Sequence, residues 1–415
     1  MVDNNKQYDC IVIGGGASGM MAAGTAVKNG KSVLLLERQN RLGAKLSITG
    51  GGRCNITNAE RNTHKLLSKY GSAEKFLYSP FSQFGVDDTF TFFSSRGLPL
   101  IIQEENRAFP ETENADDVVE VMKEYVNNEN IKVKIATKVT ELITEEGEII
   151  GVIAGQEKYF ASNFIIATGS FARTESDQDS NGISFLRMLG HTVRKPSPNI
   201  VPLKVKDAWV RNLSGTSLSS MRISFFLNGE RNFSKTGELL FTHFGISGPL
   251  ILNSSQRVSK LLENGSVTAT VDAFPHTNLG QLDDHVLKVF GENQNKQLKN
   301  VLTKIAPEGI GKALTQLLGI PKEKRVNAVT IEERKEILTL LKALPMTIEE
   351  LMGFDRAVIA DGGVSLNEID TATMRSNIYK NLYLTGDILD INRPSGGYSL
   401  QLAWTTGYVA GNSIA

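Results

Sequence analysis

The chain has 415 residues, more than a single hydrophobic core usually organises, so we expect two or three domains. Its 45 Lys and Arg residues balance 45 Asp and Glu residues, and this zero net charge argues against nucleic acid as a partner. No apolar stretch is long enough to cross a membrane, and the polar start "MVDNNKQYDC" lacks a signal-peptide segment, so we expect a cytoplasmic protein without a membrane partner.

The cysteines and histidines argue against two further kinds of site. Two cysteines, Cys10 and Cys54, are too few for a disulfide framework, and no C-x-x-C motif is present. We expect Cys10 to be a small buried residue of the first strand. None of the five histidines pairs with another at metal-ligand spacing, so we predict no metal site.

Residues 8–39 have the pattern of a strand–helix–strand unit. The apolar run at 10–13 predicts a buried parallel strand, and residues 17–29 are small and have helical spacing. Residues 32–36 form a second apolar run that ends at Glu37. This order is typical of a Rossmann-type nucleotide-binding fold.

The turn before this helix reads G-x-G-x-x-G, with Gly14, Gly16 and Gly19. Gly14 permits the tight turn, Gly16 lets a pyrophosphate approach the backbone, and Gly19 lets the helix lie close to the sheet. The helix N-terminus offers N–H groups to that pyrophosphate. Glu37 follows Gly14 by 23 residues, where an acid binds a ribose and disfavours a 2′-phosphate. FAD or NAD is therefore expected; Arg38 would suit NADP but is more simply a solvated charge.

Two later segments favour FAD over NAD. "NFIIATGS" (163–170) is an apolar strand that ends in small residues and leaves room for a ligand above the sheet edge. A strand predicted at 382–384 precedes Gly386 and Asp387, a short acceptor for a ribityl or ribose hydroxyl. A Gly-Gly pair then precedes an apolar helix at 399–410, whose N-terminus is a second site for negative charge. A long, bent ligand such as FAD needs contacts from both ends of the chain.

The middle of the chain has a different pattern. Residues 200–275 alternate apolar and polar side chains and contain an Asn-Gly turn, so we expect an inserted antiparallel β subdomain, a barrel or a sandwich. Residues 276–352 have helical spacing, with Thr330 as an N-cap, and predict a helical subdomain. The predicted class is α/β, with a discontinuous Rossmann-type FAD-binding domain at 1–199 and 353–415.

Six distinctive segments cover the chain from end to end: "IGGGASG", "RLGAKLSITGGGRCNITN", "NRAFPETENADDVV", "IIATGSFA", "GELLFTHFGISGPLIL" and "LTGDILDINRPSGGYSLQLAWTTGYVAG". Together they resemble the bacterial NAD(P)/FAD-dependent oxidoreductases, a flavoprotein family that includes aminoacetone-oxidase-like enzymes. "TGGGRCN-x-TN" is far more specific than the dinucleotide fingerprint. The resemblance implies bound FAD, a Rossmann-type FAD domain and an inserted region. It carries over as FAD contacts Gly14, Gly16, Gly19, Glu37, Lys45, residues 49–55 and Asp387.

This chain departs from the family at two turns. It has Ala-Thr-Gly-Ser at 167–170 where the family often has Ala-Thr-Gly-Gly, so that turn is expected to be less open. It has Gly386-Asp387 where Gly-Glu is common, which keeps the charge but shortens the side chain by one methylene.

The triple glycine of "TGGGRCN" (49–55) is predicted to form the floor under the flavin and its pyrophosphate, because consecutive N–H groups of such a loop can converge on an anion. Arg53 would neutralise a phosphate or stabilise negative charge on the reduced flavin. Cys54 has no second cysteine nearby, so we reject disulfide-reductase chemistry. The candidate cofactor contacts are Gly14, Gly16, Ala17, Ser18, Gly19, Glu37, Arg38, Lys45, Thr49, Gly50, Gly51, Gly52, Arg53, Cys54, Asn55, Ala167, Thr168, Gly169, Gly386, Asp387, Gly396, Gly397 and Tyr398.

Three residues are candidates for catalysis or substrate binding. His243 would be a proton donor or acceptor near the flavin, unless it is a hydrogen-bonded residue of a turn. Arg393 would bind a substrate anion, unless it pairs with an acid. Tyr398 would line the flavin, unless it serves ordinary packing.

These features predict an FAD-dependent oxidoreductase that transfers hydride between a small organic substrate and flavin N5. NAD(P)H, bound transiently because the chain has a single dinucleotide fingerprint, or O₂ would be the other redox partner. The alternatives are a flavin-dependent RNA-modifying protein, which the zero net charge disfavours, and a non-catalytic flavin-bound regulator. The substrate, the choice between NADH and NADPH, and the oligomeric state stay open.

Overall fold

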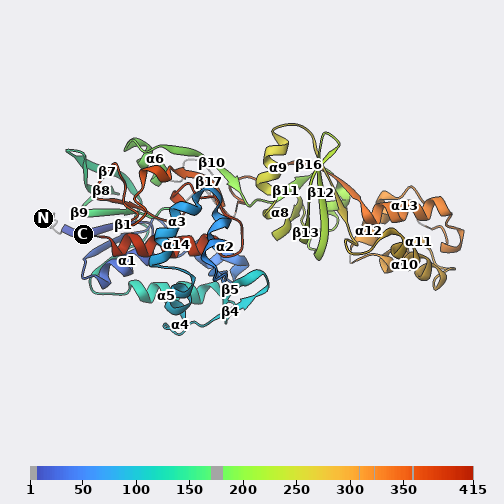
Figure 1. Ribbon diagram of the computed structural model, residues 1–415, viewed down its shortest axis with the longest axis horizontal. Helices are drawn as coiled ribbons and strands as arrows, with labels where there is room; N and C mark the ends of the chain where they lie inside the picture. Colours follow the sequence, from blue (N-terminus) through green and yellow to red (C-terminus); the bar gives the residue numbers. More distant parts are fainter. Residues whose placement is uncertain (1–6, 170–180, 308, 322, 358, 415) are drawn as a thin grey trace. The chain divides into compact units, whose positions relative to one another are not determined.

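The first and last parts of the chain form one compact unit, and the middle forms another (Figure 1). The computed structural model describes residues 7–169, 181–307, 309–321, 323–357 and 359–414. Unit 1 comprises Met1–Ser197 and Ile359–Ala415, and unit 2 comprises Pro198–Val358. Unit 2 is thus an insertion within the sequence of unit 1.

Unit 1 is built, in the part of the chain that is described, on a seven-stranded sheet with the order β6-β2-β1-β9-β8-β7, in which β18 also pairs with β9. β1 pairs in parallel with β2 and β9, and β18 pairs in parallel with β9, so the carboxyl ends of these strands meet at one edge. β2 and β18 are fully buried, as expected of parallel strands covered on both faces. The strands are β1 (Gln7–Ile13), β2 (Val33–Leu36), β6 (Ile131–Lys134), β7 (Val139–Glu145), β8 (Glu148–Ala154), β9 (Glu157–Ile166) and β18 (Leu382–Leu384).

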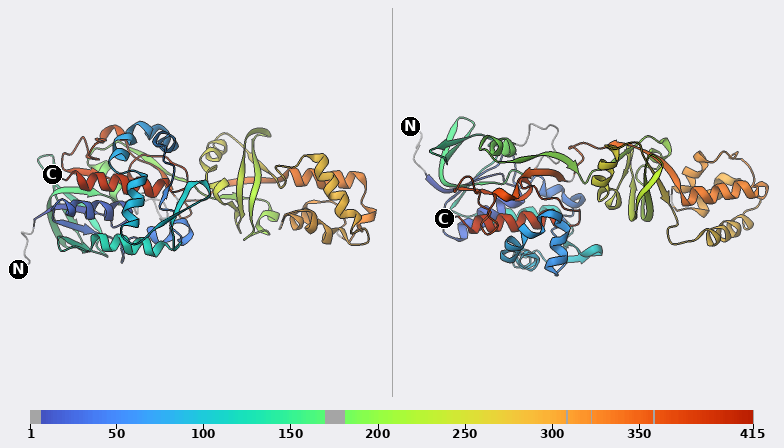
Figure 2. Two further views of the ribbon diagram at one scale, coloured as in Figure 1. Left: turned by 60° about the horizontal axis from the view of Figure 1, so that its bottom comes forward. Right: turned by 45° about the horizontal axis from the view of Figure 1, so that its top comes forward.

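Helix α1 (Ala17–Lys28) packs closely against α14 (Tyr398–Asn412) and also contacts α5 (Ala115–Val126) (Figure 2). Two glycines of α14 permit this approach. A side chain at Gly407 would collide with the carbonyl oxygen of Ser18, and one at Gly411 with that of Ala22. The last helix of the chain is thereby held against the first.

Smaller elements complete unit 1. A short antiparallel sheet has the order β3-β5-β4, and β10 pairs with β17. The bounds of these elements are β3 (Thr57–Asn58), β4 (Leu100–Gln103), β5 (Arg107–Pro110), β10 (Val193–Asn199) and β17 (Ile359–Val364), with helices α2 (Thr63–Leu67), α3 (Glu74–Gln83), α4 (Val86–Ser94) and α6 (Asn181–Met188).

In unit 2, strands β11, β14, β13, β12, β15 and β16 close into a barrel. β12 (Ser217–Leu227) and β13 (Glu230–Phe241) are joined by Asn228 and Gly229, whose positive φ angles of 50° and 88° suit the predicted hairpin turn. The structure confirms the inserted antiparallel region and identifies it as a barrel rather than a sandwich. Its other strands are β11 (Leu203–Val205), β14 (Gly245–Ser247), β15 (Val267–Asp272) and β16 (Leu344–Leu351).

Helices pack beside this barrel, and buried residues of both belong to one hydrophobic core. Thr330 caps α13 as predicted: its hydroxyl accepts from the Glu333 N–H at 3.2 Å, while the Glu333 carboxylate accepts from the Thr330 N–H at 2.7 Å. None of the helices among the described residues is long and apolar enough to cross a bilayer. The helices of unit 2 are α7 (Ala208–Arg211), α8 (Pro249–Leu252), α9 (Ser255–Leu262), α10 (Leu279–Gly291), α11 (Leu298–Ile305), α12 (Ile310–Leu317) and α13 (Ile331–Lys342).

Residues 344–352, expected in the helical subdomain, instead contribute strand β16, which pairs with β15 and β11. Leu344, Met346 and Ile348 are buried and alternate with less buried residues, which is the two-residue period of a strand. The strand is not predicted from the sequence because it begins two residues after the end of α13. Pro345 indicates the end of a helix but not the start of a strand. The expected helical assignment of this segment is therefore corrected.

Candidate functional site

The three fingerprint glycines lie at the carboxyl edge of the sheet and have different surroundings. Gly14 has a φ of 110°, and a Cβ there would lie 2.5 Å from the carbonyl oxygen of Ala167. A Cβ at Gly19 would collide with the carbonyl oxygen of Gly14. At Gly16, the N-cap of α1, a Cβ would meet no described atom within 4 Å. The first and third glycines therefore serve packing, and the second leaves the helix N-terminus open to a ligand.

Glu37 directly follows β2, beside this opening. Its carboxylate is buried and accepts hydrogen bonds from the Gly15 N–H at 2.6 Å and the Gln39 N–H at 2.7 Å. These bonds fix a negative charge close to the first turn of α1, which contains Ala17 and Ser18. The neighbouring Arg38 is exposed.

The glycine cluster forms the end of η1 (Leu46–Gly52), where Gly50, Gly51 and Gly52 have φ angles of 62°, 70° and 88°. Positions 51 and 52 are open, because a Cβ at either would meet no described atom within 4 Å. Cys54 follows with a φ of 58° and is fully buried, and this burial raises the pKa of its thiol well above the ordinary value. A neutral, inaccessible thiol agrees with the rejection of disulfide-reductase chemistry.

Arg53 is turned toward a neighbouring acid. Its guanidinium lies 3.1 Å from the Glu113 carboxylate and 4.6 Å from the ring centroid of Phe109. Its guanidinium is thus partly exposed and paired with Glu113, and its role in neutralising a phosphate or stabilising the reduced flavin stays a prediction. Two further candidates, Lys45 and Thr49, form a local turn. The Thr49 hydroxyl donates to the Lys45 carbonyl oxygen at 2.9 Å.

The segment after the glycine cluster is tied directly to the start of α14. Asn58 Nδ2 donates to the Gly396 carbonyl oxygen at 3.1 Å, and Trp404 Nε1 donates to the Ile56 carbonyl oxygen at 3.1 Å. With its amide oriented to match its neighbours, Asn55 accepts from the Gly397 N–H at 3.1 Å. A Cβ at Gly397 would collide with the backbone of residue 57. The early and late glycine clusters therefore share one site.

Gln401 is a buried residue at this junction that the sequence analysis misses. Its Oε1 accepts from the Thr57 hydroxyl at 2.5 Å and the Thr89 hydroxyl at 3.0 Å, and its Nε2 donates to the Gly85 carbonyl oxygen at 3.2 Å. It joins α14 to strand β3, which follows the glycine cluster, and to the start of α4. The signal was available, since Gln401 is a long polar residue among apolar neighbours in "SLQLAW".

Gly386 brings the end of β18 to the start of α1. Its φ is 68°, its N–H donates to the Thr406 hydroxyl at 2.9 Å, and a Cβ there would lie 2.8 Å from Ser18 Oγ. Asp387, the next residue, pairs with Arg393. The arrangement places the predicted Gly-Asp turn beside the fingerprint helix.

Arg393 is buried and bonds both to its own loop and to the start of α14. Besides Asp387, its guanidinium donates to Ser399 Oγ at 3.0 Å and to the Ile391 carbonyl oxygen at 2.6 Å. The ion pair with Asp387 agrees with the alternative that Arg393 pairs with an acid, and a substrate-anion contact stays a prediction.

The other two catalytic candidates differ in accessibility. Tyr398 is buried, its carbonyl oxygen accepts from the Tyr70 hydroxyl at 2.9 Å, and burial raises the pKa of its own hydroxyl. His243 is exposed in unit 2, edge-on to Phe244. Their catalytic roles stay predictions.

Two buried hydroxyls stand at the same sheet edge. Thr168 follows β9 and Thr385 follows β18, and the Oγ1 atom of each has no hydrogen-bond partner among the described residues. Ala167 is buried, whereas Gly169 has a φ of 72° and a Cβ there would meet no described atom within 4 Å. The predicted difference at Ser170 lies outside the described residues. Open glycines, unpartnered hydroxyls and the buried Glu37 thus line one edge, a donor and acceptor set that fits a dinucleotide.

Comparison with known proteins agrees with this fold. Residues 8–413 match the family described as HI0933-like protein Rossmann domain. A 3-dehydro-bile acid delta(4,6)-reductase of Clostridium scindens is 30% identical over 412 residues, covering 97% of this chain and 98% of that protein. A ribosomal RNA dihydrouridine synthase of Haemophilus influenzae is 26% identical, covering 99% of both chains. The corresponding enzyme of Escherichia coli is 24% identical.

Solved structures show the same fold at lower identity. The 3-ketosteroid-delta4-(5alpha)-dehydrogenase of Rhodococcus jostii RHA1 superposes with a TM-score of 0.56 at 13% identity, covering 100% of this chain and 98% of that one. At this identity the likeness concerns the architecture alone.

Proposed function

Since the chain belongs to the HI0933-like Rossmann family of flavin-dependent oxidoreductases, we propose that it is an FAD-dependent reductase that acts on a carbon–carbon double bond conjugated with a carbonyl group. The observation that carries the proposal is the meeting of the two glycine clusters at the sheet edge, where Asn58 bonds to Gly396. A site built from both ends of the chain suits an extended dinucleotide. Oxidase chemistry with O₂, which the sequence left open beside reduction by NAD(P)H, has less support, because the relatives compared above include reductases.

The residues at this edge divide the binding of FAD among them. We assign the pyrophosphate to the open N-terminus of α1 at Gly16 and the adenosine ribose to Glu37. Gly51 and Gly52 would let the loop backbone approach the ligand, and Asp387, held by Arg393, would accept from a ribityl hydroxyl. When bound, FAD supplies the N5 atom that accepts or donates hydride.

The N-terminus of α14 would stabilise negative charge on the bound cofactor. This helix has 15 residues, its N-cap is Gly397, and no side chain among the described residues caps it. The N–H groups of its first turn have no partner within the helix. Its partial positive charge stabilises negative charge placed there. Thr57 and Gln401 hold this helix end against the glycine loop. The protein thus orients and stabilises, and the cofactor carries the redox chemistry.

The substrate class follows from what the relatives' names have in common. A 3-dehydro-bile acid delta(4,6)-reductase and a dihydrouridine synthase both reduce carbon–carbon double bonds. In a 3-oxo steroid and in uridine, a carbonyl group in the same ring conjugates with such a bond and makes its far carbon a hydride acceptor. We propose a small enone as substrate, with NAD(P)H as the transiently bound reductant.

Ribosomal RNA is the second candidate substrate. Two relatives that match this chain over nearly its whole length are named for it, and uridine presents the same conjugated bond. The zero net charge of the chain disfavours a large electrostatic contribution to RNA binding without excluding a local one. We therefore no longer assume that nucleic acid is not a partner, and ribosomal RNA is included as a substrate in the experiment below.

Anaerobic stopped-flow measurements distinguish the candidates. The purified protein is first reduced with NADH or NADPH, and the flavin absorbance is then followed after mixing with a 3-oxo-Δ4 steroid, unmodified ribosomal RNA, or air-saturated buffer. We expect saturable reoxidation by the enone and a product heavier by two hydrogens. Reoxidation by RNA alone would select the second candidate. Reoxidation by air alone, with neither the enone nor RNA reoxidising the flavin, would contradict the proposal, as would a flavin that NAD(P)H does not reduce.

A further inference from the structure

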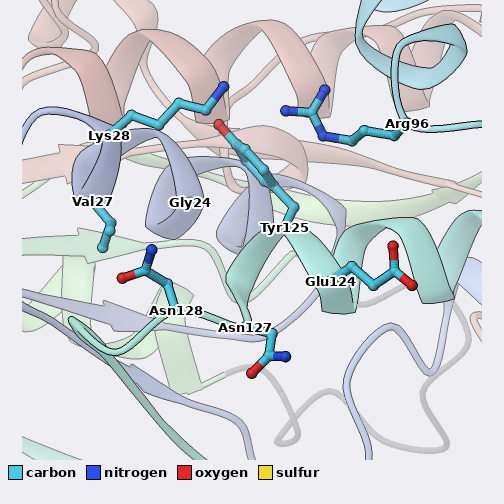
Figure 3. A pocket seen from close by; sticks show the side chains of 8 residues that line it. All are labelled: Gly24, Val27, Lys28, Arg96, Glu124, Tyr125, Asn127 and Asn128. Carbon is cyan, nitrogen blue, oxygen red and sulfur yellow. The ribbon is translucent and has the colours of Figure 1, made fainter.

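A surface pocket with a volume of about 360 Å³ lies in unit 1, at the other end of α1 from the fingerprint glycines (Figure 3). It is lined by the last turns of α1, the end of α5 and Arg96, which follows α4. Lys28 is 12 residues beyond Gly16 on the same helix, so at a rise of 1.5 Å per residue the pocket is about 18 Å away from the proposed pyrophosphate position. It is therefore separate from the candidate cofactor site.

Two cations flank one aromatic ring in this pocket. Lys28 Nζ lies 5.1 Å and Arg96 Cζ lies 4.8 Å from the centroid of the Tyr125 ring, and Figure 3 shows both charged groups directed to the side of the tyrosine hydroxyl. The ring itself is fixed. The Tyr125 hydroxyl lies 3.1 Å from Thr25 Oγ1. A Cβ at Gly24 would collide with the Tyr125 ring, so a glycine is needed at position 24 for the ring to lie there.

The two charges are not compensated within the described part of the chain, where neither Lys28 nor Arg96 forms an ion pair with a carboxylate. Burial, and next the positive charge of Arg96, lower the pKa of Lys28. Glu124 also lines the pocket, but in Figure 3 its carboxylate points away from the Tyr125 hydroxyl.

Each cation also stands near a helix C-terminus, where a positive charge is favourable. Arg96, for example, donates to the Phe92 carbonyl oxygen of α4 at 2.8 Å. This accounts for either cation by itself. It does not account for two cations on one ring beside a cavity, because they repel each other there.

We propose that this pocket binds a dianionic phosphate group, either the free ion or a phosphate monoester, with Lys28 and Arg96 as its ligands. A phosphate monoester carries nearly two negative charges at pH 7 and three acceptor oxygens, which match two cations with several N–H donors. Arginine can bind two of these oxygens at once. The free phosphate ion and the phosphate of a nucleotide share this chemistry.

Isothermal titration calorimetry of the full chain saturated with FAD, in phosphate-free buffer at constant ionic strength, tests the proposal. The probes are inorganic phosphate, AMP and, as the uncharged control, adenosine. We expect saturable binding of a phosphate-bearing probe and none of adenosine. Tighter binding of AMP would identify a nucleotide as the source, and equal binding would identify free phosphate. Binding of neither anion, or equal binding of adenosine and AMP, would overturn the proposal.

Lys28→Gln locates the site, because Lys28 is exposed and its replacement does not disturb the core. We expect this variant to bind the phosphate probe about ten-fold more weakly, the effect of losing one charge-assisted contact. Lys75→Gln, which removes an equally exposed lysine of α3, should bind as the parent does. Arg96→Gln removes the other positive charge of the pocket and should also weaken binding of the phosphate probe. Unchanged affinity in both the Lys28 and Arg96 variants would overturn the assignment.

Discussion

Gly16 separates the folding of this protein from cofactor binding at the scale of one residue. Its φ of −84° is available to any residue, and a Cβ there would meet no described atom within 4 Å, whereas one at Gly19 would collide with the backbone. A side chain at Gly16 would therefore disturb only a bound ligand. The two glycines look equivalent in the sequence motif and differ only in the folded chain.

Gly16→Val is expected to leave the thermal stability of the apoprotein nearly unchanged while weakening FAD binding about 100-fold, as expected when close backbone contacts to a phosphate are lost. Titration of FAD into the apoprotein, followed by flavin fluorescence, gives the affinity. The matched control is Gly291→Val at the exposed end of α10, where a Cβ is also free of contacts. Equal FAD affinity in the Gly16 variant and the parent would remove the pyrophosphate from this position.

At the scale of elements, a serine, a histidine and a glutamate join three segments of unit 1. His191 is buried, with Nδ1 2.9 Å from the Glu368 carboxylate and Nε2 3.1 Å from Ser376 Oγ. Ser376 Oγ also accepts from the Ile378 N–H at 3.0 Å and is itself buried. The group resembles a hydrolase triad in composition, but a buried hydroxyl that already accepts a backbone bond serves as a cross-link.

Glu368 should make stability depend on pH. Burial alone would raise its pKa, but hydrogen bonds from Thr192 and His191 outweigh burial and lower the pKa. A group with a depressed folded pKa contributes stability above its unfolded pKa of about 4.3, and loses it as pH falls through the folded value. Glu368→Gln should therefore lower the unfolding free energy by about 1–2 kcal/mol near pH 7, with the difference shrinking below about pH 4.

Urea unfolding of the parent and this variant between pH 3 and 7 measures that difference. Glu120→Gln is the control, because Glu120 forms only an exposed ion pair with Lys123 and should change stability by less than about 0.5 kcal/mol. A difference for Glu368→Gln that stays constant across the whole pH range would contradict the assignment.

Gln401 attaches α14 to strand β3 and to the start of α4. Gln401→Leu keeps the volume but removes its bonds to Thr57, Thr89 and Gly85, and should cost about 2 kcal/mol of stability and weaken FAD binding. Gln83→Leu, which removes a single bond to the Ala372 carbonyl oxygen at the end of α3, should cost less than about 1 kcal/mol. The test is urea unfolding with FAD titration of both variants. A Gln401 variant as stable as the parent would show that other contacts hold the two elements together.

At the scale of the whole molecule, the sequence predicts what depends on local pattern. The first strand–helix–strand unit, the Asn228–Gly229 turn and the Thr330 cap each follow from neighbouring residues, and each lies where it was expected. Strand β16 is missed because its partners β11 and β15 are distant in sequence. Side-chain pairing is missed for the same reason: the sequence shows that Arg53 is charged, but Glu113 becomes its neighbour only after folding.

The central claim is that one FAD is held by segments from the beginning and the end of the chain, and hydrogen–deuterium exchange with and without FAD tests it most directly. We predict that FAD slows exchange together in residues 14–19, 50–58 and 385–398. Exchange at 124–128, beside the pocket lined by Lys28 and Arg96, should change little. Slowing confined to residues 14–19 would mean that the late glycine cluster takes no part in binding, and the account would be wrong.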